Sequence, residues 1–256
     1  MSTLGPFPDL AVTVGDDYVA TVEIQRPPHN YFDHALIAAL ADAFGAIDEH
    51  EGARAIVLCA DGKSFCAGAN FTGPRDDKPG DLYNEAVRLF ATKTPVVAAV
   101  QGAAIGGGLG LALMADFRVG CPESRFAANF ARLGFHHGFG LTVTLPALVG
   151  QQAALDLLYT GRRVSGEEAH QLGMCDRLVP LDQLRDEAHA FAVEIARSAP
   201  LAVRSIRQTM RGELADKVRK ATDHELHEQD WLRRTEDFKE GVRATAERRL
   251  PDFKGR

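Results

Sequence analysis

The stretches AIVLCADGKSFCAGAN, residues 55–70, and VVAAVQGAAIGGGLGLALMAD, residues 96–116, decide the fold of this chain. In each of them a short apolar run without charges, partly β-branched, ends at a glycine-rich turn. Such runs, bounded by turn signals, are typical of strands that are buried on both faces of a sheet. In the second stretch the apolar pattern continues beyond the glycines, which predicts that a buried helix follows the turn.

The neighbouring sequence extends this pattern in both directions. Residues 10–14 and 18–24 read as two strands joined by the turn sequence GDD, which is a hairpin signal. Asp33 is expected to cap a helix, because apolar residues recur at helical spacing after it: Leu36, Ile37, Leu40, Phe44 and Ile47. Residues 117–120 read as a third core strand. The alternation of strands and helices predicts right-handed βαβ units.

The pattern changes near residue 150, where helical periodicity replaces this alternation. The later segments all read as helices: residues 151–159, 165–172, 181–199, 201–211 and 214–238. We therefore divide the chain into an α/β core, residues 1–195, and a C-terminal helical region, residues 196–256. A core of this length is a usual size for one domain.

Composition and charge exclude several classes of protein. The 256 residues include 35 acidic and 29 basic side chains, and the net charge of −6 argues against a nucleic-acid binder or a basic membrane-surface protein. Residues 96–115 carry no charge, but their glycines favour a strand, a turn and a helix over a membrane span. The N-terminal sequence lacks the features of a signal peptide, and the four cysteines have no ligand-like spacing. We therefore expect a cytoplasmic protein with free thiols.

The two glycine-rich turns carry the chemistry that the sequence offers. The turn at residues 102–110 leads into a helix whose first N–H groups have no intrahelical partners, and such donors suit an anion or a developing oxyanion. Glycine lets a ligand approach the backbone closely, because it has no Cβ atom. Close packing of the helix on the sheet, or a phosphate-binding turn, would explain the same glycines. A P-loop is excluded, because no GxxxxGK followed by Ser or Thr occurs.

The order of the motifs is more specific than either turn alone. FCAGAN at residues 65–70, GGG at residues 106–108 and the helix LGLALMAD at residues 109–116 follow one another in an order that resembles the crotonase superfamily, also called the enoyl-CoA hydratase/isomerase family. Further segments are similar to motifs of that family in the same order: residues 134–140, 158–173 and 240–254. By resemblance over about residues 10–254, the chain is identified as a member of the family.

The resemblance implies an α/β fold, a crotonase-like spiral of ββα units with a C-terminal helical region that forms homotrimers or hexamers. It implies an acyl-CoA thioester as the substrate, so that coenzyme A is part of the substrate and no separate cofactor is needed. The shared chemistry of the family is stabilisation of a thioester enolate by two backbone N–H groups, which fall here on Ala69 and Gly107. Substrate-binding roles are carried over in the same way to Ala67, Gly68, Asn70, Gly106, Phe130 and Lys254.

Two departures from the family pattern bear on the reaction. Hydratases of the family use two glutamates as general acid and base, and their positions correspond here to Gly110 and Phe130. Neither residue has a side chain that transfers a proton, so hydration by the usual mechanism is not expected. In addition, Asn70 replaces an aspartate that is common in the family.

His136 and His137 occupy a turn in which the family usually has a proline. Histidine titrates near neutral pH, so we expect one of the two to act as acid or base, and alanine at position 137 to abolish turnover. The alternative is that the pair caps a turn or packs under Phe139. A metal site is not predicted, because no third ligand accompanies the two histidines.

The sequence therefore leaves several functions open. An acyl-CoA enzyme without the glutamates could catalyse isomerisation, decarboxylation or cleavage of a C–C bond. The alternatives are a β-diketone-type hydrolase of the same superfamily and a non-catalytic acyl-CoA binder or scaffold. Neither a nucleic acid nor a membrane is expected as a partner. Four phenylalanines fit either an apolar acyl pocket or ordinary core: Phe126, Phe130, Phe135 and Phe139.

Overall fold

The protein is seen in a computed structural model that describes residues 2–70 and 79–256. Within these residues seven strands form one sheet, in the spatial order β1 (Ser2–Thr3), β2 (Leu10–Val14), β3 (Val19–Ile24), β4 (Ala55–Ala60), β5 (Val96–Val100), β7 (Phe117–Gly120) and β10 (Arg177–Leu178). The first three strands are antiparallel neighbours, whereas β3 to β10 run parallel. The predicted hairpin, the three core strands and the α/β class are confirmed.

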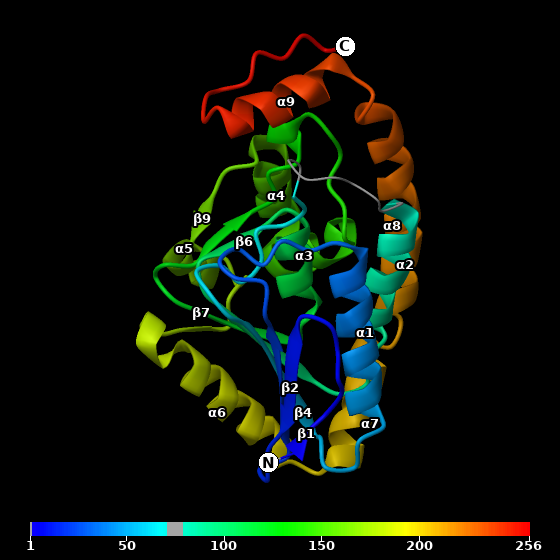
Figure 1. Ribbon diagram of the computed structural model, residues 1–256, viewed down its shortest axis with the longest axis vertical. Coiled ribbons are helices and arrows are strands. Elements are labelled where there is room, and N and C mark those ends of the chain that lie inside the picture. The colour runs from blue at the N-terminus through cyan, green and yellow to red at the C-terminus, as the bar shows by residue number, and fades with distance from the viewer. Residues whose placement is uncertain (1, 71–78) are drawn as a thin grey trace.

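The parallel part of the sheet is buried on both faces. Alternate residues of a strand point to opposite faces, and those of β4 divide between two clusters of buried side chains. On one face α6 (Leu184–Ala196) covers the sheet with four residues at helical spacing: Leu184, Ala188, Ala192 and Ala196. On the other face lies the larger cluster, which includes α1 (His34–Asp48). Figure 1 shows α6 and α1 on opposite sides of the strands.

The expected cap of α1 is present. The Asp33 carboxylate accepts a hydrogen bond from the Leu36 N–H at 2.9 Å, and the apolar side chains that predicted the helix are buried against the sheet. An aspartate at this position satisfies one of the N–H groups that have no partner in the first turn. Phe32 precedes the cap and faces the functional site, so the start of α1 also fixes one wall of that site.

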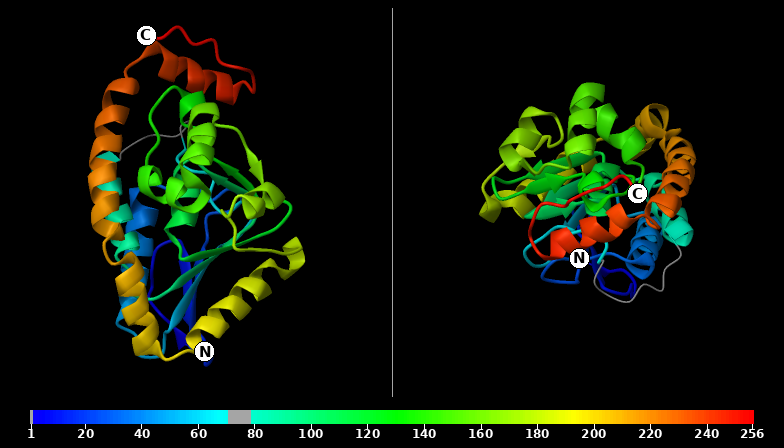
Figure 2. Two further views of the ribbon diagram at one scale, coloured as in Figure 1. Left: turned by 180° about the vertical axis from the view of Figure 1, so that it is seen from behind. Right: turned by 90° about the horizontal axis from the view of Figure 1, so that it is seen from above.

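The remaining helices cover the upper part and one side of the molecule. They are α2 (Pro79–Phe90), α3 (Gly107–Met114), α4 (Leu141–Thr160), α5 (Gly166–Gln171), α7 (Pro200–Arg211), α8 (Leu214–Leu232) and α9 (Glu236–Ala246), with the 3₁₀ turns η1 (Ala131–Leu133) and η2 (Leu181–Gln183). α8 runs beside α2 and contacts α4, and α9 turns back across the top of the molecule onto η1 (Figure 1 and Figure 2). The C-terminal region thus returns to the end of the core where both glycine-rich turns lie.

Two of the helix predictions are corrected by the structure. The helix expected over residues 214–238 is two helices, because the Thr235 hydroxyl donates to the Leu232 carbonyl at 2.7 Å and accepts from the Phe238 N–H at 3.1 Å. That hydroxyl closes α8 and caps α9 in one step. The helix expected to start at residue 151 begins ten residues earlier, and Gly150, with a φ of 78°, marks a kink inside it.

The segment without charges at residues 96–115 forms β5, the short strand β6 (Ala103–Ile105) and α3, as predicted. β6 belongs to a second sheet, in which it pairs with β8 (Arg125–Ala127), and β8 pairs with β9 (Val164–Ser165). In the described part of the chain, α4 is one helix that is long and apolar enough to cross a membrane by length and composition alone. Core helices pass the same test, and α4 packs against α3 and α8.

Candidate active site

The two glycine-rich turns lie side by side at the carboxyl ends of β4 and β5. Backbone hydrogen bonds join them, from the Cys66 N–H to the Ala103 carbonyl at 2.9 Å and from the Ile105 N–H to the Cys66 carbonyl at 3.1 Å. A third bond, from the Phe32 N–H to the Gly68 carbonyl at 3.1 Å, fixes the first turn against the start of α1. The carboxyl ends of parallel strands are where open α/β sheets usually bind their ligands.

Glycine is required for this close approach. Gly68 has a φ of 83°, and a Cβ atom there would lie 2.6 Å from the Ile105 carbonyl oxygen. A Cβ atom at Gly108 would overlap the Cys66 carbonyl oxygen. The glycines therefore bring two stretches of backbone together, as the close-packing interpretation predicts, and they also expose the backbone to a ligand.

The Ala69 and Gly107 N–H groups lie at the junction of the two turns. Gly107 is the first residue of α3, so its N–H precedes the helical hydrogen-bond ladder and lies at the positive end of the helix. A Cβ atom at Gly68, next to Ala69, would lie 3.9 Å from the Gly107 nitrogen, which shows how near the two turns are. Both residues line one cavity. The two residues predicted to donate to one oxygen atom therefore border the same cavity, and their role as donors stays a prediction.

The cavity has a volume of about 680 Å³, which is within the usual range for sites that bind small molecules. The predicted binding positions Ala67, Gly68, Asn70 and Gly106 line it beside the two donors. Much of the remaining wall is apolar: Phe32, Leu82, Leu133, Phe135, Phe139 and Val242. Three of the four predicted pocket phenylalanines line the cavity, whereas Phe126 is fully buried in the core.

Aromatic rings lie at Phe130 and against Gly110, the two positions to which the family resemblance assigns the hydratase glutamates. Phe130 itself faces the cavity, with its ring 5.4 Å from the ring of Phe135. At Gly110 a Cβ atom would meet Cβ of Phe139 at 2.6 Å and two of its ring atoms at 2.8 Å. Phe139 is held there in a left-handed conformation, with a φ of 62°. A side chain at position 110 would therefore need the volume that Phe139 occupies.

His136 and His137 do not line the cavity, contrary to the expectation that one of them serves the reaction. Their rings stack on each other at 4.1 Å. The Nε2 atom of His137 lies 2.8 Å from the Thr142 hydroxyl, and the Nδ1 atom of His136 lies 2.8 Å from the His137 carbonyl oxygen. Burial lowers the pKa of His137 to about 3, with a smaller contribution from the neighbouring His136. His137 is therefore neutral at physiological pH and is turned toward α8.

The partner of this turn on α8 is Glu225, whose side chain is fully buried. Its carboxylate accepts the Gly140 N–H at 2.9 Å, the Thr142 N–H at 3.0 Å and the Thr142 hydroxyl at 2.6 Å. These bonds satisfy N–H groups at the start of α4, where a negative charge is favourable. The local sequence around the two histidines is thus organised by a residue 85 positions further along the chain.

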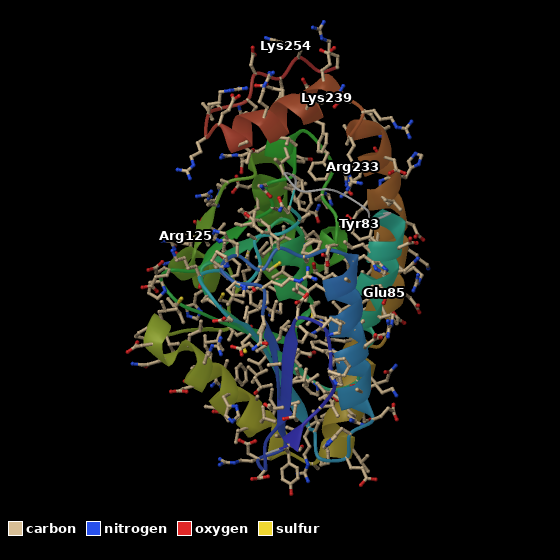
Figure 3. The ribbon with its side chains drawn as sticks, in the orientation of Figure 1. Tyr83, Glu85, Arg125, Arg233, Lys239 and Lys254 are labelled. Carbon is tan, nitrogen blue, oxygen red and sulfur yellow. The ribbon has the colours of Figure 1, made fainter. Side chains whose placement is uncertain are left out.

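Lys254 and Cys66 lie away from the chemistry of the cavity. The Lys254 ammonium lies 2.8 Å from the Asp252 carboxylate on the C-terminal tail, and Lys254 is not among the residues that line the cavity. Figure 3 shows it on the tail above α9. Cys66 is buried, and burial raises the pKa of its thiol to about 12, so it packs as a small side chain and is no nucleophile. The three other cysteines are also free and buried.

Sequence reasoning missed the polar side chains that α2 and α8 contribute to the cavity. Tyr83 comes from α2, Gln229 comes from α8, and Arg233 directly follows the last residue of α8. Gln229 and Arg233 are four residues apart and lie on one face of the predicted helix, which is the signal that the sequence contained. Polar residues at that spacing usually face solvent, so the signal alone does not point to a site.

A parallel sheet whose two glycine-rich turns border a cavity at its carboxyl edge has the form of an α/β enzyme. The family model of the enoyl-CoA hydratases and isomerases matches residues 15–256. A crotonyl-CoA hydratase of Syntrophomonas wolfei is 31% identical, covering 93% of this chain and 95% of its own. A 1,2-epoxyphenylacetyl-CoA isomerase of Escherichia coli is 30% identical to this chain, and the match covers 93% of this chain and 95% of the isomerase.

Solved structures agree with these sequences. The crystal structure of an enoyl-CoA hydratase/isomerase from Pseudoalteromonas atlantica has a TM-score of 0.86 and 30% identity to this chain, covering 96% of this chain and 100% of that one. The protein therefore belongs to the enoyl-CoA hydratase/isomerase family, the crotonases, as the sequence motifs indicated. Its homologues are enzymes that act on acyl-CoA thioesters.

Proposed function

We propose that this protein is an acyl-CoA enzyme that stabilises a thioester enolate at the Ala69 and Gly107 N–H groups and does not add water. Cleavage of a C–C bond, with decarboxylation as its simplest form, is the reaction that the cavity favours. The observation that supports this proposal is the lining of the cavity. Among its described residues, Asp33 is the one carboxylate, and none is a histidine.

Asp33 is poorly suited to take a proton from a substrate. One of its oxygens accepts the Leu36 N–H, and the other lies 2.8 Å from the Arg26 guanidinium. Burial opposes ionisation, but the hydrogen bonds from Arg26 and Leu36 outweigh it and lower the pKa of the Asp33 carboxyl. Isomerisation and hydration both require a general base. Because the Asp33 carboxylate is bonded to Arg26 and Leu36 and has a lowered pKa, it is a poor base for either reaction.

Cleavage of a C–C bond needs no base at the α-carbon. When the bond between the α-carbon and a carboxylate breaks, carbon dioxide leaves and the electron pair remains on the α-carbon, conjugated with the thioester carbonyl. The negative charge then develops on the thioester oxygen, where the Ala69 and Gly107 N–H groups donate. Preorganised donors of this kind are worth about 2.7–4 kcal/mol each in the transition state.

The intermediate must then gain a proton at the α-carbon. Tyr83 lines the cavity, and burial raises the pKa of its phenol, with a smaller contribution from the Glu225 carboxylate. The phenol therefore stays protonated and does not act as a base, and its proton is donated to the Gln229 amide oxygen at 3.2 Å. Water that enters from the cavity mouth supplies the proton to the α-carbon.

The test compares two thioesters with the purified protein. With crotonyl-CoA we expect no loss of the ultraviolet absorbance of the conjugated thioester. With a 2-carboxyacyl-CoA we expect release of carbon dioxide and, in D2O, one deuterium at the α-carbon of the product. Rapid loss of the crotonyl-CoA absorbance would refute the proposal. Binding of both esters without turnover would favour the non-catalytic binder, and cleavage of a cyclic β-diketone without binding of CoA esters would favour the hydrolase.

The proposal includes assembly into trimers or hexamers in the cytoplasm. The support for assembly is α7, none of whose residues is buried and which exposes three large apolar side chains: Leu201, Ile206 and Met210. Apolar patches of this kind often mark contacts between protein chains. Light scattering coupled to gel filtration measures the mass directly, and a monomer at micromolar concentration would contradict this part of the proposal.

A further inference from the structure

A cluster of three polar side chains stands in the otherwise apolar wall that α2 and α8 give to the cavity. Tyr83 extends from α2, Gln229 extends from α8, and Arg233 extends from the residue that caps the C-terminal end of α8. Figure 3 shows Tyr83 and Arg233 close together on the side where α2 and α8 run next to each other. The apolar neighbours along this wall are Leu82, Leu133, Phe135 and Val242.

The amide of Gln229 has a fixed orientation. Its nitrogen donates to the His136 carbonyl at 3.0 Å and to the His137 carbonyl at 3.2 Å. Its oxygen accepts the Tyr83 hydroxyl at 3.2 Å and one terminal nitrogen of Arg233 at 2.6 Å. Backbone carbonyl oxygens can only accept hydrogen bonds, so the amide nitrogen must be the atom that faces His136 and His137. The amide oxygen therefore faces Tyr83 and Arg233. Gln229 thus positions both groups.

Arg233 is half-buried, and the Asp230 carboxylate acts on its charge only from beyond ion-pair distance. Its Nε atom is buried without a hydrogen-bond partner, and no ion pair joins it to a carboxylate in residues 2–70 and 79–256. Its guanidinium carbon lies 5.5 Å from the centre of the Phe135 ring. Burial lowers the pKa of Arg233, but arginine stays protonated in proteins. A half-buried guanidinium without an ion-pair partner, and with one buried N–H unsatisfied, is costly to the fold, and a ligand anion would remove that cost.

Tyr83 offers a second polar group beside this cation. Its hydroxyl packs against the backbone at Gly138, where a Cβ atom would overlap the hydroxyl oxygen. Glycine at position 138 therefore keeps space for the phenol. The phenol donates to Gln229 and retains acceptor capacity, and a neighbouring hydroxyl is a further site at which an oxygen-rich ligand could bind.

We infer that this cluster holds a carboxylate at the far end of the acyl group, so that the substrates carry this distal carboxylate in addition to the group that is cleaved from the α-carbon. The inference rests on the proposed binding of acyl-CoA. A guanidinium presents two parallel N–H donors that match a carboxylate. The aliphatic and aromatic wall around the cluster suits the methylene chain that would connect this carboxylate to the thioester. A phosphate of coenzyme A is the competing occupant, but the exposed Arg163 also lines the cavity and suits that group better.

The test measures binding by calorimetry for two series of CoA esters. One series carries unbranched dicarboxylic acyl groups of four to eight carbons, and the other carries monocarboxylic groups of equal carbon number. For at least one chain length we expect the dicarboxylic ester to bind about tenfold or more tightly, since hydrogen bonds to a charged group contribute this much. Equal affinities at every length would overturn the inference, whereas a failure of both series to bind would overturn the proposed function itself.

Variants assign the preference to the cluster. Arg233→Gln is expected to lose the tenfold preference while it still binds the monocarboxylic esters, and their binding shows that the variant is folded. Arg234→Gln, at the exposed neighbouring position, is the matched control and should keep the preference. Tyr83→Phe serves as a second variant and should reduce the preference in part. If Arg233→Gln weakens free coenzyme A and both series alike, Arg233 binds a phosphate and the inference is wrong.

Discussion

Substitution of Gly110 by alanine tests whether the position of the first hydratase glutamate is closed. Gly110 lies in the middle of α3, where alanine normally stabilises a helix relative to glycine by about 0.5–1 kcal/mol. Here, however, the added Cβ atom would meet three atoms of Phe139 at 2.6–2.8 Å. Real Cβ atoms do not approach their neighbours so closely, so one of the two segments must move.

The size of the effect follows from what surrounds the clash. Phe139 is 1% exposed and is held at a φ of 62°, so neither its ring nor its backbone has free space into which it can move. Adding a methyl group to a packed core of this kind typically costs about 1–3 kcal/mol, which exceeds the gain in helix propensity. We expect Gly110→Ala to lower the free energy of unfolding by about 1–2 kcal/mol, and glutamate to lower it further.

Gly45 provides the control, because it lies inside α1 with no atom within 4 Å of a Cβ atom built on it. Urea denaturation, followed by circular dichroism, should show that Gly45→Ala raises the free energy of unfolding by about 0.5–1 kcal/mol. The two identical substitutions should therefore have opposite signs. If Gly110→Ala is as stabilising as Gly45→Ala, Phe139 does not close this position and the structural argument against a hydratase fails.

Three further predictions concern other parts of the site. Gly107→Ala places a Cβ atom against the Phe32 ring, so the backbone that carries the proposed oxyanion donor must shift. Single-turnover kinetics should therefore show a rate lower by about 10²-fold. An unchanged rate would remove Gly107 from the mechanism. Burial holds the pKa of His137 at about 3 in the folded protein, below its ordinary value of 6.5. As the pH falls, the unfolded chain therefore protonates at His137 before the folded protein does. The contribution of His137 to the free energy of unfolding is then greatest above pH 6.5 and falls, by at most about 1.4 kcal/mol per pH unit, as the pH drops toward 3. His137→Gln should flatten this pH dependence and leave the turnover rate unchanged. Loss of turnover in this variant would show that His137 has a catalytic role. Asp33→Ala removes the cap of α1 and should lower the free energy of unfolding by about 1 kcal/mol; no change in urea denaturation would contradict the capping.

The elements that the sequence predicted best are those fixed by local patterns. The apolar run of β4 is buried at all six residues, and the Asp33 cap forms three residues before its hydrogen-bond donor. The glycine-rich turns were also predictable, because their close approach to other backbone segments excludes every larger residue. The strand and the cap are set by neighbouring residues, whereas the glycines record contacts between turns about 40 residues apart that the sequence pattern already marks.

The elements that the sequence did not predict depend on distant partners. His136 and His137 follow a motif of the active site, but the carboxylate that organises their turn comes from Glu225 on α8. The division between α8 and α9 depends on a single threonine hydroxyl that bonds to both helices. Arg233 could not be assigned from its spacing, because the phenylalanine and tyrosine that surround it come from other segments.

Glu225, Gln229 and Arg233 stand at intervals of four residues on one face of α8 and its C-terminal cap, and they span about 12 Å of that stretch. The first caps α4, the second holds the turn at residues 136–137, and the third reaches the cavity. One stretch near the C-terminus thus fixes the start of α4, the turn at residues 136–137 and one wall of the cavity relative to one another. Exchange of this segment between relatives would therefore transfer acyl selectivity as a single unit, whereas exchange of the two glycine-rich turns would transfer only the backbone donors.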